Sequence, residues 1–373
     1  MIKIPRHIEE LQAYKAGKPV DELMREKKLS KIVKLASNEN PFGTSPKAMK
    51  AIRKNVQYIH RYTDPSAYKF VHVLSKKYNK KPEQIISSSG SDSLLQYIII
   101  AFSTENDELL TSEGTFAGWY ANVNKFGRNS KLISLNDYHI DLTEIANNIS
   151  PRTKIIYLSN PNNPTGTMFS KSEFEKFMEK IPDDVLVLLD EAYTVYAASN
   201  PDYPDGLQYN LENLIVIRTF SKSYGLAGIR IGIGFGPEYL IKELYKVKLP
   251  FEPNLLAQEA AIAALNDEEF LIKTKLQNAK SLVMLKHAFE QLNIRYVNTS
   301  SNFYLLLFPN KEFARNFHNE CLNNGLIIRH LDTFGIPNGI RINSGTDDET
   351  EFAIDVMRRV YPKLLEKYNL NVI

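Results

Sequence analysis

Lys222 is the residue whose neighbours most clearly suit it to chemistry rather than to a solvated surface. Phe220 and Tyr224 stand two residues away on either side, which is unlike the setting of an ordinary surface lysine. An amine that is protected from water loses its proton more readily, and only the neutral amine attacks a carbonyl carbon. Ser221 precedes the lysine and Arg230 follows it, and both side-chain types bind phosphate. The run therefore predicts a lysine that can form a Schiff base with a phosphorylated aldehyde.

A carboxylate stands at the end of one of the expected strands. Asp190 directly follows the apolar run 185–189, and Tyr193 comes shortly after it. The carboxyl end of a buried strand lies at the ligand-binding edge of an α/β sheet. A lone aspartate in this place is more simply a helix N-cap, so a ligand role depends on the rest of the chain.

Two further runs suit the approach of a small molecule to the backbone. Residues 160–166 read Asn-Pro-Asn-Asn-Pro-Thr-Gly, a composition that makes a fixed turn. Gly90, Ser91 and Asp92 come directly before an apolar helix expected at 94–102, and free N–H groups at a helix start attract phosphate. Taken alone, residues 160–166 are explained as a plain turn, and residues 90–92 are more simply explained as a helix cap. No lysine follows the glycine as it does in the phosphate loop of nucleotide-binding proteins.

In combination, these runs resemble the signatures of the pyridoxal-phosphate-dependent aminotransferases of fold type I. The likeness rests on residues 160–166, on Asp-Glu-Ala-Tyr at 190–193 and on the lysine run at 219–230. Within this family the chain is most similar to the histidinol-phosphate aminotransferase branch, through Asn-Glu-Asn-Pro-Phe-Gly at 38–43 and Tyr-Lys-Ala-Gly-Lys at 14–18. The resemblance implies pyridoxal 5'-phosphate as the cofactor.

The resemblance also implies a role for each matching residue of the cofactor site. Lys222 would carry the cofactor aldehyde, Asp190 would pair with the ring nitrogen and Tyr193 would donate to the ring oxygen. The other cofactor contacts would come from Ser91, Asp92, Ser221 and Arg230 at the phosphate, Asn163 at the ring hydroxyl oxygen, and Trp119 or Tyr120 stacked on the ring. No cluster of histidine and cysteine has the spacing of a zinc site, so we expect no metal.

Residues for the substrate and for a partner subunit follow from the same resemblance. Tyr62 would reach into the cofactor site of a neighbouring subunit, which predicts a homodimer with shared active sites. A planar guanidinium suits a carboxylate or a phosphate. The amino donor would be bound by Tyr14, Asn38, Arg329 and Arg341.

The function implied is transfer of an amino group from L-histidinol phosphate to 2-oxoglutarate, which gives imidazole acetol phosphate and L-glutamate. Related enzymes use nearly the same frame for aromatic amino acids or to decarboxylate threonine phosphate, and both remain alternatives. A cofactor-binding regulator without turnover is a third. A nucleotide-binding α/β protein is disfavoured by the missing lysine of the phosphate loop.

Composition and charge narrow the class of protein. The chain has 373 residues, of which 43% are hydrophobic and 24% charged, with a net charge of +3, as in ordinary globular proteins. The basic residues are spread out, so we expect no nucleic-acid partner. Cys321 is the only cysteine, which excludes an internal disulfide framework and favours a reducing, cytoplasmic location. No apolar run is long enough to span a bilayer, and we expect no membrane partner.

Apolar, β-rich runs alternate with helical patterns after the first hundred or so residues. Strands are expected at 108–111, 131–135, 155–158, 185–189 and 214–219. Such alternation predicts an α/β fold with a mostly parallel sheet wrapped by helices, and the resemblance implies seven strands. From about Pro253 the pattern changes to long helices with strands at 295–308 and 339–343. This change predicts a second, smaller domain of the α+β class.

Three parts of the chain are therefore expected. Residues 1–39 form an N-terminal arm that belongs to the small domain. Residues 40–255 form the large, cofactor-binding domain, and residues 256–373 complete the small domain.

Overall fold

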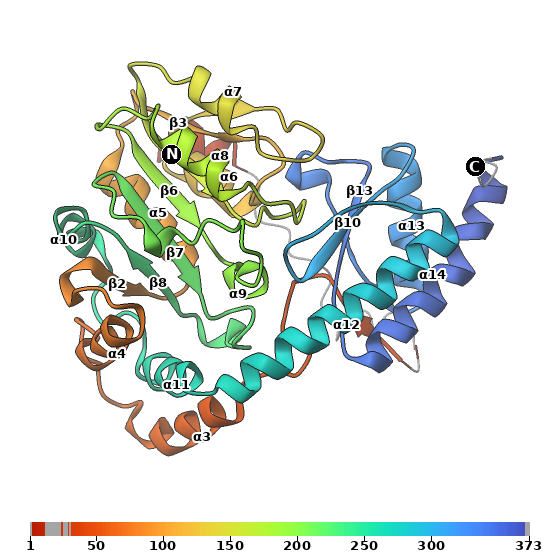
Figure 1. The fold of residues 1–373 in the computed structure, drawn as a ribbon, viewed down its shortest axis with the longest axis horizontal. Coiled ribbons are helices and arrows are strands. Elements are labelled where there is room, and N and C mark those ends of the chain that lie inside the picture. The colour runs from red at the N-terminus through yellow and green to blue at the C-terminus, as the bar shows by residue number, and fades with distance from the viewer. Residues whose placement is uncertain (1, 12–23, 25–28, 30, 370–373) are drawn as a thin grey trace.

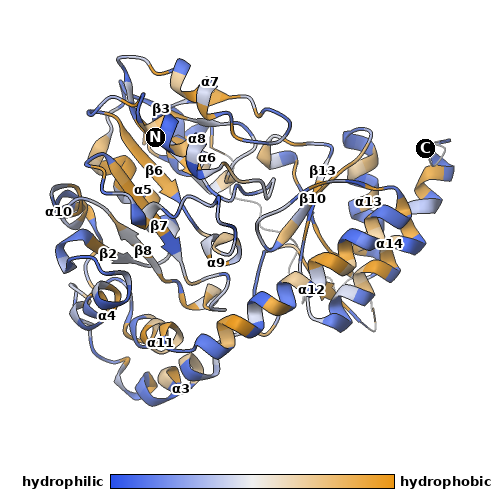
Figure 2. Cartoon of the chain, viewed as in Figure 1, coloured by the Kyte–Doolittle hydropathy of each residue, from blue (hydrophilic) through white to orange (hydrophobic). Residues whose placement is uncertain are grey.

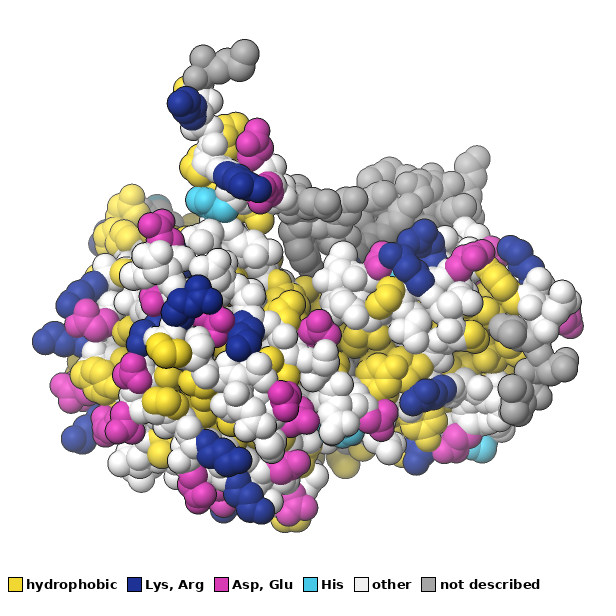
Figure 3. Space-filling view, turned by 90° about the horizontal axis from the view of Figure 1, so that it is seen from above, with side chains coloured by type: hydrophobic (Ala, Val, Ile, Leu, Met, Phe, Trp, Pro, Cys, Tyr) yellow, Lys and Arg dark blue, Asp and Glu magenta, His cyan; other side chains and the backbone are white. Residues whose placement is uncertain are grey.

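The computed structural model describes residues 2–11, 24, 29 and 31–369. A larger body is built on a seven-stranded sheet, and a smaller body lies at the far end of the long helix α12 (Glu268–Leu292), as Figure 1 shows. Charged side chains of both signs are interspersed over the face seen in Figure 3. Within the described part of the chain, no helix is both long and apolar enough to cross a membrane.

The larger sheet is mostly parallel, as the sequence predicts. Its strands, in spatial order, are β2 (Ile85–Ser88), β8 (Gly232–Phe235), β7 (Leu214–Thr219), β6 (Leu186–Asp190), β5 (Thr153–Ser159), β3 (Glu108–Ser112) and β4 (Asn129–Ile133). Strands β7, β6, β5, β3 and β4 pair in parallel, and β8 runs antiparallel to both of its neighbours. The five parallel strands thus bring their carboxyl ends to one edge of the sheet.

Helices cover both faces of this sheet, and successive residues of a strand face opposite sides. In β6, Leu186 and Leu188 pack with one group of helices, while Val187 and Leu189 pack with another. This explains why the central strands are almost continuously apolar, as their colour in Figure 2 shows. The helices on the first face are α5 (Ser91–Phe102), α6 (Ala117–Lys125) and α10 (Glu238–Val247), and those on the second are α7 (Leu142–Asn147) and α8 (Lys171–Met178).

A third group of helices packs at the β2–β8 side of the sheet. Helix α11 runs along α3, and both pack near α4. The bounds are α3 (Pro46–Asn55), α4 (Tyr68–Tyr78) and α11 (Leu255–Leu265), and two short helices are α1 (Arg6–Glu9) and α9 (Thr194–Ala197). Single 3-10 turns are Val56–Tyr58, Pro82–Gln84, Gly206–Gln208, Ala227–Ile229 and Asp332–Phe334.

The smaller body has an antiparallel four-stranded sheet backed by helices. Its strand order is β12 (Arg329–His330), β13 (Gly339–Asn343), β10 (Phe303–Leu307) and β9 (Arg295–Val297), with helices α13 (Lys311–Asn323) and α14 (Asp347–Lys367). The N-terminal strand β1 (Val33–Lys34) pairs in parallel with β11 (Leu326–Ile327) and so joins the smaller body. The division of the chain at residues 39 and 255 stays a prediction.

Some strands differ from those expected. Strands β2 and β8 were not foreseen, and β4 ends two residues before the expected 131–135 run does. Strand β8 contains two glycines, which are depleted in strands, yet a Cβ on Gly232 would lie 2.4 Å from the backbone nitrogen of Ser91. The close approach of β8 to the start of α5 therefore requires glycine there. The expected 295–308 strand is instead the antiparallel pair β9 and β10.

A buried ionic cluster ties the ends of β6 and β7 together. The Arg218 guanidinium donates to Oε2 of Glu191 at 2.8 Å and also bonds Asp205, while the Glu191 side chain is fully buried. Oε1 of Glu191 accepts from the backbone N–H of Gly206 at 2.6 Å. Burial raises the pKa of Glu191, and the charge of Arg218 opposes that rise. The arginine is therefore the main counter-charge of a carboxylate that water cannot reach.

Replacing Arg218 with methionine should lower the free energy of unfolding by about 3–5 kcal/mol, because it leaves Glu191 buried and unpaired. Urea unfolding followed by circular dichroism measures this change. The double variant Arg218→Met with Glu191→Gln should recover part of the loss, since the unpaired charge is then absent. Equal stability of Arg218→Met and the wild type would contradict the inferred pairing.

Candidate functional site

A cavity of about 220 Å³ lies at the edge of the large sheet where the parallel strands end. Ser159, Asp190 and Thr219, the last residues of β5, β6 and β7, all line it. Eight residues predicted for the cofactor site line the cavity, namely Ser91, Asp92, Asn163, Asp190, Tyr193, Ser221, Lys222 and Arg230. The fold thus brings together residues that are far apart in the sequence.

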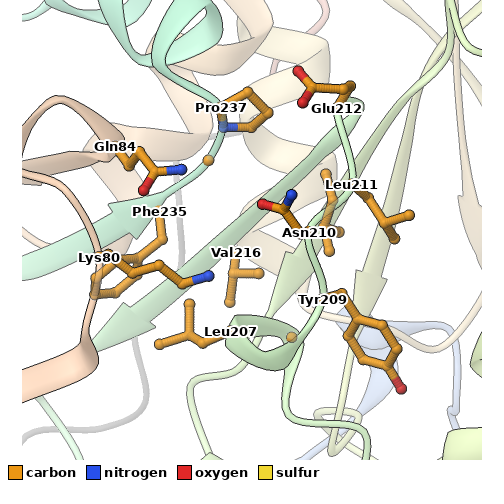
Figure 4. Close-up of a pocket in the computed structure, with 13 residues that line it drawn as sticks. Lys80, Gln84, Leu207, Tyr209, Asn210, Leu211, Glu212, Val216, Phe235 and Pro237 are labelled. Carbon is orange, nitrogen blue, oxygen red and sulfur yellow. The ribbon is translucent and has the colours of Figure 1, made fainter.

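A second hollow, of about 50 Å³, lies at the opposite edge of the same sheet (Figure 4). It is lined by the first residue of β7, Leu214, and the last residue of the antiparallel β8, Phe235. Its volume is less than a quarter of that of the first cavity. None of the residues predicted for the site lines it, so we place the chemistry at the first cavity.

The Lys222 amine is held at one wall of the cavity. Its Nζ donates to the backbone carbonyl of Ser37 at 3.1 Å. Removal of the amine from water lowers the pKa of Lys222 to about 8, and the positive charge of Arg341 adds to this effect. At pH 7 about a tenth of the amine is then neutral, far more than for an ordinary lysine. The side chain is therefore suited to attack a carbonyl carbon.

The Asp190 carboxylate is buried and receives a donor on each oxygen. The Tyr157 hydroxyl donates to Oδ2 at 2.9 Å, and the backbone N–H of Ala192 donates to Oδ1 at 3.1 Å. Burial raises the pKa of Asp190 to about 6, and both hydrogen bonds oppose that rise. The group is anionic above that pH and can pair with a cationic N–H in the cavity. Sequence reasoning missed Tyr157, although a hydroxyl in the middle of an apolar strand was a signal.

Tyr193 stands beside Asp190 at the cavity and is tied to the N-terminal segment. Its hydroxyl accepts a hydrogen bond from Nδ2 of Asn38 at 2.7 Å. Burial raises the pKa of Tyr193 to about 12, so the hydroxyl keeps its proton as a donor. Asn38 adopts a left-handed backbone, with φ of 56°, that asparagine tolerates. Asn38 was predicted to contact substrate, and the structure places it against this tyrosine.

The start of α5 and Arg230 form an anion cradle at one end of the cavity. Oδ2 of Asp92 lies 4.0 Å from Nη2 of Arg230, and the arginine Nη1 lies 3.5 Å from the Ser221 hydroxyl. Gly90, which precedes the helix, leaves room for the guanidinium, because a Cβ there would lie 2.5 Å from Nη2. Backbone N–H groups at the helix start and a fixed cation together favour a phosphate.

These features fit the cofactor that the sequence resemblance implies. Lys222 offers an amine for the aldehyde, Asp190 a carboxylate for the ring nitrogen, and the cradle a place for the phosphate. Asn163, which was predicted to contact the ring hydroxyl, also lines the cavity. Pyridoxal phosphate needs each of these groups.

The aromatic residue at the cavity differs from the predicted one. Trp119 is fully buried in the core, where its ring stacks on Tyr157 with centroids 4.6 Å apart. The Tyr120 hydroxyl donates to the Ser112 carbonyl at 2.6 Å, and neither residue lines the cavity. Phe116, directly before α6, does line it. Trp119 packs with the sheet in the core instead, so Phe116 is the aromatic side chain that the cavity presents.

The two predicted substrate arginines come from neighbouring strands of the smaller body. Arg341 is buried, bonds the Asn163 side chain and donates to the Ala36 carbonyl at 2.7 Å. Arg329 pairs with it in the β12–β13 register. The ring of Phe334 lies 5.6 Å from the Arg329 guanidinium and 5.7 Å from that of Arg341. Both guanidinium groups thus lie over the ring of Phe334, and Arg341 is the one that contacts Asn163.

The other predicted residues lie elsewhere. Tyr62 is 84% exposed, stacks on Phe251 with centroids 4.3 Å apart and does not line this cavity. Tyr14 lies outside the described residues. Glu39, from the Asn-Glu-Asn-Pro run, was not predicted as a site residue, but it lines the cavity and pairs with Lys34 at 3.0 Å.

Comparison with known proteins gives concordant matches. Residues 30–357 match the family described as aminotransferase class I and II. A histidinol-phosphate aminotransferase 2 of Carboxydothermus hydrogenoformans is 37% identical over 96% of this chain and 99% of its own, and a histidinol-phosphate aminotransferase of Caldicellulosiruptor saccharolyticus is 37% identical over 95% and 98%.

Solved structures show the same fold. A histidinol-phosphate aminotransferase from Sinorhizobium meliloti, solved in complex with pyridoxal-5'-phosphate, superposes with a TM-score of 0.90 at 24% identity, over 98% of this chain and 99% of the other. An aspartate aminotransferase mutant from Thermus thermophilus gives 0.83 at 20% identity, over 96% and 100%. Both comparisons show similarity of the fold.

The lowered pKa of Lys222 predicts its reactivity in cofactor-free protein. Reductive alkylation of Lys222 by a small aldehyde, quantified by peptide mass spectrometry, should rise with a midpoint near pH 8. Arg341→Gln should move the midpoint to higher pH, because it removes a positive charge that disfavours the protonated amine. Arg329→Gln is the matched control and should leave the midpoint in place. A wild-type midpoint near the ordinary lysine value of about 10.4 would rule out the shift.

Proposed function

The chain belongs to the family of class I and II aminotransferases, and we propose that it is a pyridoxal-phosphate-dependent histidinol-phosphate aminotransferase. The reaction would transfer the amino group of L-histidinol phosphate to 2-oxoglutarate, giving imidazole acetol phosphate and L-glutamate. The observation that carries the proposal is the meeting of Lys222, Asp190 and the Arg230 cradle in one cavity. The 37% identity to relatives of that name, over nearly the full length of the chain, supports this choice of substrate.

The residues of the cavity divide the work of the reaction. When bound, pyridoxal phosphate supplies an electron sink for the charge that develops at the amino carbon. Lys222 would hold the cofactor, and its freed Nζ would take the proton from the substrate carbon. Asp190 would keep the ring nitrogen protonated, and Tyr193 would donate to the ring oxygen. Phe116, in place of Trp119, would lie against the ring.

Substrate recognition would use a carboxylate of the cavity wall together with two arginines of the smaller body, of which Arg341 contacts the lining residue Asn163. Arg329 and Arg341, which share the Phe334 ring, offer planar cations for the phosphate and so favour a phosphorylated donor. Glu39 is a carboxylate on the cavity wall that can accept a hydrogen bond from an imidazole N–H. A phenyl ring offers no such donor, and this difference favours histidinol phosphate over phenylalanine.

A homodimer with shared sites is also proposed. Tyr62 is largely exposed although it is aromatic, and it stacks on Phe251, which is also exposed. Two segments, residues 56–62 and 249–251, carry further exposed apolar side chains beside these two. Together the exposed apolar residues of the two segments are Val56, Tyr58, Ile59, Tyr62, Leu249 and Phe251. Contiguous exposed apolar side chains mark interaction sites, and a second copy would bury them. In that dimer, Tyr62 would reach the phosphate end of the neighbouring site.

The location and the division of the chain complete the proposal. We infer a cytoplasmic location because Cys321 is the only cysteine and cannot form an internal disulfide. The arm 1–39 and the region 256–373 would form the small domain, and residues 40–255 the large one. The pairing of β1 with β11 supports the assignment of the arm.

Histidinol phosphate should react faster than histidinol in the half-reaction, measured as loss of the bound cofactor's absorbance. Charge-assisted hydrogen bonds contribute about 1.5–3 kcal/mol each, so kcat/KM should differ by well over tenfold. Arg329→Gln should remove much of this difference. Arg315→Gln is a control, because Arg315 lies on α13 and contacts Asp332 instead. Phenylalanine outperforming histidinol phosphate would favour the aromatic enzyme, and CO2 release from threonine phosphate would favour the decarboxylase.

Inactive subunits should complement each other across the dimer. A Lys222→Ala protein mixed with a Tyr62→Ala protein should recover about a quarter of wild-type activity, because half of the dimers are hybrids with one intact site of two. Lys222→Ala mixed with Asp190→Ala is the matched control and should recover nothing, since both residues belong to the same site. Absence of recovery, with subunit exchange confirmed by mass spectrometry, would place Tyr62 outside the shared site.

A further inference from the structure

We propose that Tyr157, braced by Trp119, is a positioning residue that keeps the Asp190 carboxylate charged and oriented toward the cavity. The inference rests on the proposed function, because it concerns the carboxylate that would hold the ring nitrogen. Neither Tyr157 nor Trp119 lines the cavity, so both would act through Asp190 rather than on the substrate.

The first observation is the contact between the two side chains. Tyr157 is fully buried on β5, beside β6, and donates its hydroxyl hydrogen to Oδ2 of Asp190 at 2.9 Å. The other oxygen, Oδ1, accepts from the backbone N–H of Ala192. One donor on each oxygen fixes the plane of the carboxylate. Asp190 also lines the cavity, so the plane of its carboxylate sets the direction in which the oxygens can accept a hydrogen bond from a ligand.

The second observation is the charge around the carboxylate. Burial disfavours the anion of Asp190, and the carboxylates of Asp92 and Glu191 add to this effect. Arg218 compensates Glu191, but Asp190 depends on its two hydrogen-bond donors. Burial and the nearby Asp190 raise the pKa of Tyr157 far above its ordinary range, so the phenol remains a donor at any working pH. The hydrogen bond from the hydroxyl therefore stabilises the Asp190 anion against the cost of its burial.

The third observation is the stack that holds the phenol. The rings of Trp119 and Tyr157 are nearly parallel, at 7°, with centroids 4.6 Å apart, and both side chains are fully buried. Among the described residues, none bonds the Trp119 Nε1, so the indole acts by its packing face. A phenol in such a stack keeps one orientation, and its hydroxyl stays aimed at Asp190.

The experiment replaces Tyr157 with phenylalanine in the cofactor-loaded enzyme, which removes the hydroxyl and keeps the ring. With pyridoxal phosphate labelled at the ring nitrogen, the 15N resonance at pH 7 should move toward the unprotonated value, because the proton passes to Asp190. The kcat for the amino donor should fall on the order of tenfold or more, with KM changing less. Tyr203→Phe is the matched control, because Tyr203 is also buried and donates to the Asn160 carbonyl at 3.1 Å.

Two further variants separate positioning from folding. Trp119→Phe keeps the hydroxyl but weakens the stack, so its 15N shift should lie between those of the wild type and Tyr157→Phe. In an Asp190→Asn background, Tyr157→Phe should cost no further activity, because the hydroxyl acts through the carboxylate. A fully additive loss in that background, or a wild-type 15N shift in a loaded Tyr157→Phe enzyme, would overturn the inference.

The outcomes also separate this inference from the proposed function. A wild-type protein that takes up no pyridoxal phosphate overturns both. A wild-type protein that accepts another amino donor overturns only the choice of substrate, and the 15N measurement then still decides the role of Tyr157.

Discussion

The burial of one carboxylate, Asp190, is the constraint on which the site depends. A charged group at the end of an apolar strand loses its hydration, and its pKa rises to about 6 as a result. Three neighbouring segments limit this cost: β5 supplies the Tyr157 hydroxyl, the chain after β6 supplies the Ala192 N–H, and α6 supplies the Trp119 ring behind the phenol. The packing of the core on this face of the sheet therefore helps to keep the Asp190 carboxylate charged and oriented.

The same burial acts on Lys222 in the opposite sense. Removal from water favours a neutral amine, as it favours a neutral carboxyl group, so the two pKa values move toward each other, to about 8 and about 6. Between these values Asp190 is ionised and a usable fraction of Lys222 is unprotonated. One cavity thus prepares an anion for the ring nitrogen and a nucleophile for the aldehyde. The cations Arg341 and Arg230 push Lys222 further in this direction.

Much of this arrangement was predictable from the sequence, and the exceptions have physical reasons. The parallel strands were visible because their residues face helices on both sides, and eight predicted residues meet at one cavity because parallel strands end at one edge. Strand β8 was missed because its glycines serve a close approach to α5 rather than strand formation. Trp119 or Tyr120 was expected at the cavity and Phe116 was not, because a motif fixes the order of residues but not the rotation of α6. Tyr157 was missed because its partner lies on another strand.

The path of residues 33–38 has a consequence for how the protein is made. This early segment pairs with β11, and its carbonyls at Ala36 and Ser37 bond Arg341 and Lys222. Contacts between residues so distant in the chain form slowly, because a long loop must close first. During synthesis the larger sheet emerges well before β11 and β13 exist. The N-terminal segment therefore gains these partners only when the last strands have been synthesised. A chain that stops before β13 lacks Arg341 and Asn343, which hold the segment that carries the cavity-lining residues Ser37 and Glu39.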